Sequence, residues 1–401
     1  MNTRTSMLLT CLVAATLAAC GGGGDSSPAP GPAPAPSPAP APAPSPAPAP
    51  ANQSPTAHIA PISGIKLVGQ SVSLDGTAST DPESAPLTFQ WSIVGRPESS
   101  RAALGNPTAS VASIEPDLAG TYALQLVVSD GVSNSAPETI EVRVGTPVAG
   151  AIAGTTSWSL KNSPYVITGK LMIPAATALN IEPGVEVMGN HQDIQVQGTL
   201  AVNGTPSNKV TISDTVISPA GTMANNHAIR IRGAQITGGS VYAATGNAIY
   251  GTLELTDSRL SDLDTYNAYI YLWYPTGPSK IERNVFVRSG GISYGLSDVA
   301  LTIRNNAFIE WKSPPVTNWA MYGSASADVS LNSFLSTDRI AVELPNGYTS
   351  AHINASRNYW GTTDIAVINK MIQDKNDDLT SSDYVTYLPI LTAPDAATPS
   401  P

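Results

Sequence analysis

The sequence SRNYWGTTD at residues 356–364 contains an Asn-Tyr-Trp tripeptide that recurs upstream in altered form. In each copy a polar or small residue is followed, two positions later, by a large apolar residue. Successive copies are 22 to 26 residues apart, and such a period predicts a solenoid whose turns are stable only against one another. The copies are Ala234-Gln235-Ile236, Ser258-Arg259-Leu260, Asn284-Val285-Phe286, Asn306-Ala307-Phe308 and Asn332-Ser333-Phe334.

Two columns of this repeat are predicted to be structural. Asn at a fixed turn position can adopt the left-handed backbone conformation and bond its counterpart in the next turn. The large apolar residue two positions later is predicted to point into the core, with Trp360 as the last rung. This structural ladder comprises Asn284, Asn306, Asn332 and Asn358 with Phe286, Phe308, Phe334 and Trp360. A surface ladder is predicted for Arg283, Arg304 and Arg357, just before the Asn column.

A second strand repeats in step with the first, and it supplies the predicted ligand-binding residues. Its inward column is predicted to contain Ile249, Ile270, Ile292, Met321 and Val342. Strand alternation then directs the neighbouring aromatic side chains outward, where they can stack on sugar rings. The predicted glycan-binding set is Tyr250, Tyr269, Tyr271, Trp273, Tyr322 and Glu343. The alternative is that loops of neighbouring turns bury these rings.

The spacing predicts an all-β protein in which residues 155–361 form a right-handed parallel β-helix, within a domain spanning 150–395. Irregular spacing and the lack of tight hairpin loops disfavour an antiparallel sandwich or a propeller.

A capping helix is predicted directly after Gly361 to cover the open end of the solenoid. Thr362 or Thr363 is its expected N-cap, and Ile365, Ile368, Met371 and Ile372 line one face. A final strand or extended return is expected at 385–391, and a disordered tail at 396–401.

Two stretches resemble bacterial β-helix-repeat proteins of the pectin-lyase-like superfamily, namely YVITGKLMIPAATALNIEPGVEV (165–187) and NYWGTTD (358–364). The resemblance implies that an enzyme of this class would use clustered carboxylates with calcium and a basic residue, or paired Asp acids. The sequence shows no such cluster, so no catalytic or metal site is assigned and a non-catalytic protein is favoured. No cofactor is expected; calcium near Asp262 and Asp264, or near Asp374, Asp377 and Asp378, is the alternative. His58, His191, His227 and His352 occur singly and are predicted to be surface or turn residues.

Residues 54–146 are predicted to form a separate β-sandwich, because short alternating runs recur between Asp-containing turns. The stretches VSLDGTASTDPESAPLTFQWSIV (72–94) and PDLAGTYALQLVVSDG (116–131) closely resemble PKD-type immunoglobulin-like domains. Trp91 matches the core Trp of that family, and the resemblance implies a spacer or adhesion module. Structural turn roles are expected for Asp75, Asp81, Asp117 and Asp130, with calcium as the alternative.

The N-terminal residues predict export and membrane anchoring. Residues 1–20 contain an apolar run too short for a membrane span, which is typical of a signal peptide. The run ends in Leu-Ala-Ala-Cys, which resembles a bacterial lipobox and implies lipidation of Cys20. Gly21 after the Cys implies sorting to the outer membrane of a Gram-negative bacterium, facing the periplasm or the cell surface. The Gly- and then Pro/Ala-rich linker at 21–53 predicts a stalk, or else a disordered spacer.

Composition limits the choice of partners. The chain has 30 acidic and 20 basic residues, a net charge of −10, and no local Lys/Arg cluster, which argues against nucleic acid. A monomer is expected. The favoured hypothesis is an anchored lipoprotein whose β-helix binds a polysaccharide or cell-surface glycan without catalysis. The alternatives are a polysaccharide lyase or glycoside hydrolase, and a scaffold without a ligand.

Overall fold

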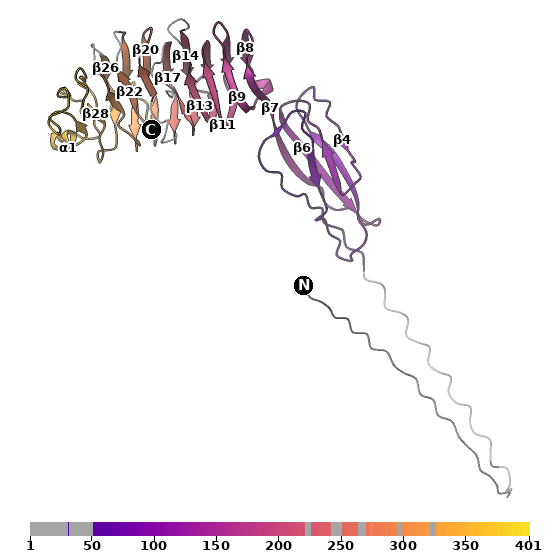
Figure 1. Cartoon of the computed structure of the whole chain (residues 1–401). Coiled ribbons are helices and arrows are strands. Elements are labelled where there is room, and N and C mark those ends of the chain that lie inside the picture. The colour runs from indigo at the N-terminus through magenta and orange to yellow at the C-terminus, as the bar shows by residue number, and fades with distance from the viewer. Residues whose placement is uncertain are drawn as a thin grey trace, which may run out of the picture. The chain divides into compact units, whose positions relative to one another are not determined.

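The computed structural model describes residue 31 and residues 51–220, 226–241, 251–263, 270–273, 275–295, 299–320 and 326–401. The predicted signal peptide, Cys20 and nearly all of the linker lie outside these residues. Within them, the chain folds into a β-sandwich followed by a parallel β-helix, as the sequence predicts, and contains almost no helix (Figure 1).

The β-sandwich has the composition expected from its alternating runs. Its strands are β1 (Lys66–Leu67), β2 (Val72–Asp75), β3 (Thr88–Gly95), β4 (Leu104–Gly105), β5 (Val111–Ile114), β6 (Gly120–Ser129) and the first half of β7 (Glu138–Ala151). One sheet has the order β2-β5-β4, and the other pairs β3, β6 and β7 antiparallel. Trp91 and Tyr122 are fully buried between the sheets. The Tyr122 hydroxyl donates to the Leu118 carbonyl (3.0 Å), a contact typical of immunoglobulin-like domains.

The four Asp residues of the sandwich serve its turns. Asp75 accepts hydrogen bonds from Thr77, and Asp81 accepts two backbone N–H donors. Asp130 accepts the N–H groups of the turn that follows it. Asp117 accepts the Ser100 hydroxyl and the Arg101 N–H, both at 2.6 Å, and these bonds lower its pKa to about 2.

Strand β7 belongs to both folded parts of the chain. Residues 138–144 pair antiparallel with β6, and residues 146–151 pair parallel with β9 (Tyr165–Ile173) of the β-helix. Gly145 lies at the changeover, where a Cβ atom would stand 2.5 Å from Val166 Cγ2 and 3.0 Å from the Pro164 carbonyl oxygen. The β-helix therefore begins inside a strand of the sandwich, with no intervening linker.

Three parallel sheets build the β-helix, and their strands stack side by side in Figure 1. The first sheet contains β8 (Thr155–Trp158), β10 (Ala178–Ile181), β12 (Thr199–Asn203), β14 (His227–Arg232), β17 (Gly251–Thr256), β20 (Ser279–Glu282), β23 (Leu301–Arg304) and β26 (Ala327–Ser330). The second continues from β7 and β9 through β11 (Glu186–Val196), β13 (Val210–Pro219), β15 (Ala234–Thr237), β18 (Arg259–Ser261), β21 (Val285–Val287), β24 (Ala307–Ile309) and β27 (Ser333–Phe334). The third contains β19 (Ile270–Trp273), β22 (Ile292–Gly295), β25 (Val316–Asn318), β28 (Val342–Glu343) and β29 (Ile372–Gln373). The short β16 (Ser240–Val241) pairs with β13, and a 3-10 turn covers Leu160–Asn162.

The aromatic column of the core is continuous from turn to turn. Phe286 stacks on Phe308 with ring centroids 4.8 Å apart, and Phe308 stacks on Phe334 at 5.6 Å. Trp360 follows at 4.9 Å from Phe334 and is fully buried. The rings lie in register because the strands that carry them pair residue for residue.

The Asn column forms a buried ladder of hydrogen bonds. The Asn332 Oδ1 accepts both the backbone N–H and the side-chain amide of Asn306 at 3.0 Å, and Asn358 repeats this arrangement toward Asn332. The left-handed conformation was predicted for the Asn residues themselves, and this is wrong. It belongs to the residue before each one, such as Arg283 and Asn305. That preceding residue makes the bend, which leaves the Asn side chain free to point along the stack.

The cap differs from its prediction. Helix α1 is only Ile365–Asn369, and its N-cap is Asp364, whose carboxylate accepts the Ala366 N–H at 2.9 Å. Ile365 is 40% exposed, whereas Ile368, Met371 and Ile372 are buried. The helix ends early because Ile372–Gln373 form β29, which adds a last strand to the third sheet.

The chain after the cap returns along the β-helix. Thr386 pairs with residues 353–355 as an extended return, in agreement with the prediction for 385–391. The segment at 396–401 was predicted to be disordered, but Thr398 donates to the Leu331 carbonyl at 2.7 Å. The tail thus contacts the β-helix, and in Figure 1 the C-terminus lies against the middle of the stacked strands.

Candidate binding groove

Tyr271 and Glu343 are the members of the predicted glycan-binding set whose side chains the structure describes. Tyr271 pairs with Ser293, then Thr317, then Glu343, then Gln373, so the residues in register with it on the following turns are polar. Ser293 and Thr317 are fully buried and Tyr271 is half-buried against the core, so the outer face of the third sheet is covered there. Burial raises the pKa of Glu343.

The other members of that set are only partly described. Tyr250, Tyr269 and Tyr322 lie outside the described residues, as do Ile249 and Met321. Trp273 lies in β19, but its side chain is outside the description. The inward rung between Ile292 and Val342 is Val316 and not Met321. Val316 follows Ile292 by 24 residues, close to the spacing of the other rungs, whereas Met321 follows it by 29.

A hollow lies along the turns that join the first sheet to the second, and we call it the turn groove. Its volume is about 480 Å³. The backbone bends at Gly233, Asp257 and Arg283 are left-handed, which brings equivalent turn positions into one line along the solenoid. The groove is lined by Gly204, Pro206, Lys209, Arg232, Gly233, Asp257, Ser258, Arg259, Arg283, Val285, Ala397, Pro399 and Ser400.

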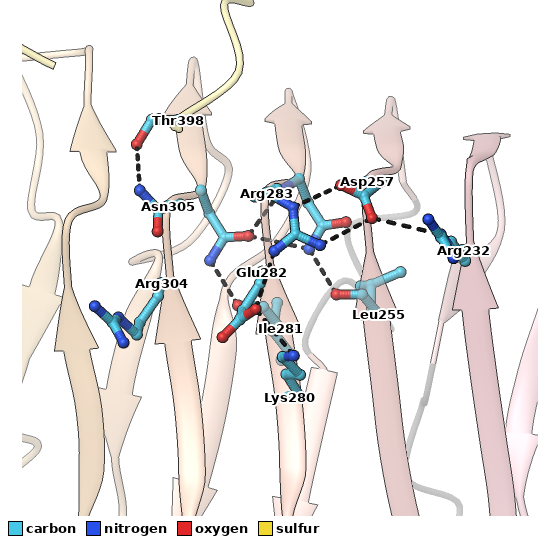
Figure 2. Close-up of polar contacts among 12 residues, drawn as sticks. Arg232, Leu255, Asp257, Lys280, Ile281, Glu282, Arg283, Arg304, Asn305 and Thr398 are labelled. Carbon is cyan, nitrogen blue, oxygen red and sulfur yellow. Dashed lines mark hydrogen bonds and ion pairs between the residues drawn. The ribbon is translucent and has the colours of Figure 1, made fainter. Parts of the chain in front are cut away.

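One carboxylate of the groove is held by a guanidinium group. Arg283 donates to both oxygens of Asp257, at 2.7 and 2.9 Å, and also contacts Glu282 at 3.1 Å (Figure 2). Arg232 approaches the same Asp257 at 3.8 Å. These hydrogen bonds hold the pKa of Asp257 below its usual range and raise the pKa of Arg283. Asp257 therefore positions two cations and is not available as a proton donor near neutral pH.

Positive charge is in excess in the groove. Its lining contains four cationic side chains, Lys209, Arg232, Arg259 and Arg283, and the carboxylate of Asp257; Glu282, beside the groove, also contacts Arg283. The whole chain, by contrast, carries a net charge of −10. Among the described residues neither Lys209 nor Arg259 makes an ion pair within 4.0 Å. Two cationic side chains thus remain available for an anionic ligand.

The predicted alternative of a calcium site can be compared with the described carboxylates. No group of three or more His, Cys, Asp or Glu side chains there is placed to hold a metal ion. Asp262 is bound by Arg288 at 2.6 Å, and Asp264 lies outside the described residues. Asp374 and Asp378 accept backbone N–H donors in the turns after the cap.

One His prediction is wrong. His227 is buried in β14, and desolvation lowers its pKa to about 4. His58, His191 and His352 are exposed, as expected.

The sequence reasoning missed the groove because its cations are far apart in the chain. It searched for Lys and Arg that are adjacent in sequence, whereas these come from successive turns. Lys209, Arg232, Arg259 and Arg283 are 23, 27 and 24 residues apart, close to the spacing of the Asn column. Counting charges at the repeat period would have revealed the cluster.

Comparison with known proteins identifies the first domain. Residues 63–144 match the family model of a PKD domain. This segment is a PKD-like domain. It is also similar to the solution structure of the PKD domain from KIAA 1837 protein, with 24% identity, a TM-score of 0.20, and coverage of 25% of this chain and all of that one.

A second similar structure is a nucleoside hydrolase-related hypothetical protein from Saccharophagus degradans that is described as associated with carbohydrate metabolism. The match has 24% identity and a TM-score of 0.20, and it covers 23% of this chain and 26% of that one. No curated protein matches the chain. The described residues contain no helix long and apolar enough to cross a membrane. A PKD-like domain joined to a β-helix fits a surface or carbohydrate-related protein.

Proposed function

We propose that this protein is a non-catalytic, surface-anchored protein whose β-helix binds an acidic polysaccharide in the turn groove. The observation that carries the proposal is the presence of Lys209 and Arg259, which form no ion pair within 4.0 Å in the described part of the chain, beside the Arg283–Asp257 pair. Carboxylate and sulfate groups are the partners that guanidinium and ammonium groups recognise. An aromatic platform, the original expectation, has less support because the polar column beside Tyr271 is covered.

The shape of the groove suits a linear polymer. It follows the turns from Gly204 through Gly233 and Asp257 to Arg283. Neighbouring strands of a sheet are about 4.8 Å apart, so these turns extend over about 15 Å. A polymer that presents a negative charge at intervals can meet cations from successive turns at once. Arg283 is already oriented by Asp257, which reduces the entropy lost on binding.

The rest of the chain supports a surface location in this proposal. Lipidation of Cys20 would attach the protein to the outer membrane, and the Pro/Ala-rich linker would separate the folded parts from the bilayer. The PKD-like domain then acts as a spacer that presents the β-helix to glycans.

Binding to matched polysaccharides tests the proposed function. We expect polygalacturonate to bind and its carboxyl-reduced, neutral form not to bind, because the ligand must supply negative charge. The double variant Lys209→Ala with Arg259→Ala should weaken binding at least tenfold. A hydrogen bond to a charged group contributes about 1.5–3 kcal/mol, and about 1.4 kcal/mol corresponds to a factor of ten in affinity. Isothermal titration calorimetry provides the measurement.

The double variant Lys161→Ala with Lys170→Ala is the matched control, because it also removes two positive charges, at exposed residues that do not line the groove. It should bind as the unaltered chain does. The proposed site would be refuted if the neutral polymer bound as tightly as polygalacturonate, or if the Lys209/Arg259 double variant bound as tightly as the unaltered chain. Shortening of the polymer during incubation would show that the protein is an enzyme and contradict the non-catalytic assignment.

A further inference from the structure

The last part of the chain lies on the same line of turns as the turn groove. We call residues 391–400 the strap. The Leu391 N–H donates to the Asn358 carbonyl at 2.9 Å, and Thr398 is anchored on the Leu331 carbonyl. The strap therefore runs from the last rung of the Asn ladder back toward Arg283, against the direction of the repeat.

Its second anchor is a side chain at a left-handed bend. The Asn305 amide donates to the Asp395 carboxylate at 2.8 Å and to the Thr398 hydroxyl at 3.3 Å. Figure 2 shows the contact with Thr398. Asn305 occupies the turn position that Arg283 and Asp257 occupy one and two turns earlier. Beyond this anchor, Pro399 and Ser400 line the end of the groove. The strap and the groove are thus consecutive parts of one track.

The side chains beneath the track change from exposed or half-buried to buried along the column that leads under the strap. The outward column of the second sheet contains Gln235, Arg259, Val285, Ala307 and Ser333, in register. Gln235 is exposed and Arg259 half-buried, but Val285, Ala307 and Ser333 are at most 6% exposed. Under the strap the column consists of the small residues Ala307 and Ser333, whereas Val285 and the cation Arg259 line the open groove.

The strap is held weakly for its length. Its anchors are the few hydrogen bonds of Leu391, Asp395 and Thr398, and residues 392–394, 396 and 397 are exposed. Segments with few buried apolar contacts open at low free-energy cost. A ligand that gains contacts on the covered track can displace such a segment.

Given the proposed binding of an acidic polysaccharide in the groove, we propose that the strap is a displaceable stop that determines how long a polysaccharide chain the β-helix holds. The turns at Asn305 and Leu331, to which the strap is bonded, extend the track by about 10 Å beyond Arg283. With the strap in place, the affinity rises with ligand length only until the open groove is filled. Without it, longer chains gain further contacts.

A size series of oligogalacturonates tests this, with dissociation constants measured on the full chain. For the unaltered chain we expect the affinity to level off at a short oligomer. The double variant Asn305→Ala with Thr398→Ala, which removes the side-chain anchors, should level off at a longer oligomer and bind the longest ones about tenfold more tightly. Short oligomers should bind both chains equally, because the cations of the groove are unchanged.

Two further variants serve as a control and as a second form of the test. Thr392→Ala is the matched control, since Thr392 is exposed in the same strap. A chain ending at Pro394 repeats the test if the double variant unfolds, and circular dichroism verifies the fold of each chain. A length dependence that is the same in all chains refutes the strap proposal alone, as does weaker binding of short oligomers without the strap. If no oligomer binds the full chain, the proposed function fails with it.

Discussion

At the scale of single residues, the repeat is specified by side chains that satisfy one another across turns. Every Asn of the ladder donates its amide to a backbone carbonyl of the adjoining strand, and all but the last, Asn358, also donate to the next Asn. Unsatisfied buried polar groups are costly, so these bonds define the register along with the apolar core. The Phe column beside it supplies the buried area.

Within this column, substitution of Trp360 should lower the stability of the fold the most. It is fully buried between Phe334 and Tyr387, at the end of the stack. Trp360→Ala should lower the free energy of unfolding by about 3–5 kcal/mol, because it removes a large ring and leaves a cavity. Denaturant unfolding monitored by circular dichroism measures this. Trp360→Phe, which continues the existing column, should cost clearly less. A loss of polysaccharide binding with unchanged stability would contradict a structural role.

At the scale of elements, the strands with strong repeats were predictable and the cap was not. The copies of the 358–360 tripeptide give the second sheet directly, and the runs at Thr88–Gly95 and Gly120–Ser129 give two of the strands of the sandwich. Helical periodicity overextended α1, because Met371 and Ile372 serve the last strand of the third sheet and look the same in a pattern. The groove depends on side chains from four turns and on a returning tail, and neither feature has a local signal.

Substitution of Gly145 tests whether strand β7 requires a residue without a side chain at the changeover between the two domains. An added Cβ would lie 2.5 Å from Val166 Cγ2, and the stiff Val side chain has little freedom to move. Gly145→Ala should destabilise the protein by about 1–3 kcal/mol, the usual cost of overpacking. Differential scanning calorimetry should show a lower Tm. Gly169→Ala in β9 is the control, since its nearest atom, Ala149 Cβ, is 3.5 Å away. Equal Tm values for both variants would show that the changeover tolerates a side chain.

At the scale of the whole molecule, the cations matter because the remainder of the chain is acidic. A net charge of −10 repels an acidic polymer at long range, so binding depends on a short-range, localised excess of positive charge. The affinity should therefore respond to both pH and salt in ways that follow from the groups in the groove.

Lowering the pH should distinguish the contribution of the ligand's charge to binding from the contribution of the protein's charge. Arg283 keeps the pKa of Asp257 below its usual range, so this carboxylate stays ionised at a pH where an ordinary carboxyl group, with a pKa of about 4, is half protonated. Binding of a carboxylated polymer should decline as its own carboxylates become protonated near that pH, whereas a sulfated polymer should still bind. Titrations at several pH values and salt concentrations measure this. Identical decline for both polymers would place the pH-sensitive group on the protein.

The stability of the protein must be followed in the same series. His227 is buried and has a pKa of about 4, below the ordinary value of 6.5. The unfolded chain therefore binds a proton first, and the contribution of this group to stability is lost as pH falls from about 6.5 toward 4. Thermal unfolding at each pH distinguishes loss of the fold from loss of the ligand.

The shared strand β7 also determines how the molecule responds to tension. One uninterrupted backbone segment is bonded laterally to β6 in the sandwich and to β9 in the β-helix. A pull along this strand loads both rows of hydrogen bonds in shear, so many bonds must break together before the strand is pulled out of either domain. If the protein is attached to a membrane at its N-terminus and binds a polymer through its β-helix, as proposed, this strand would help both domains to stay folded when moving liquid pulls on the polymer.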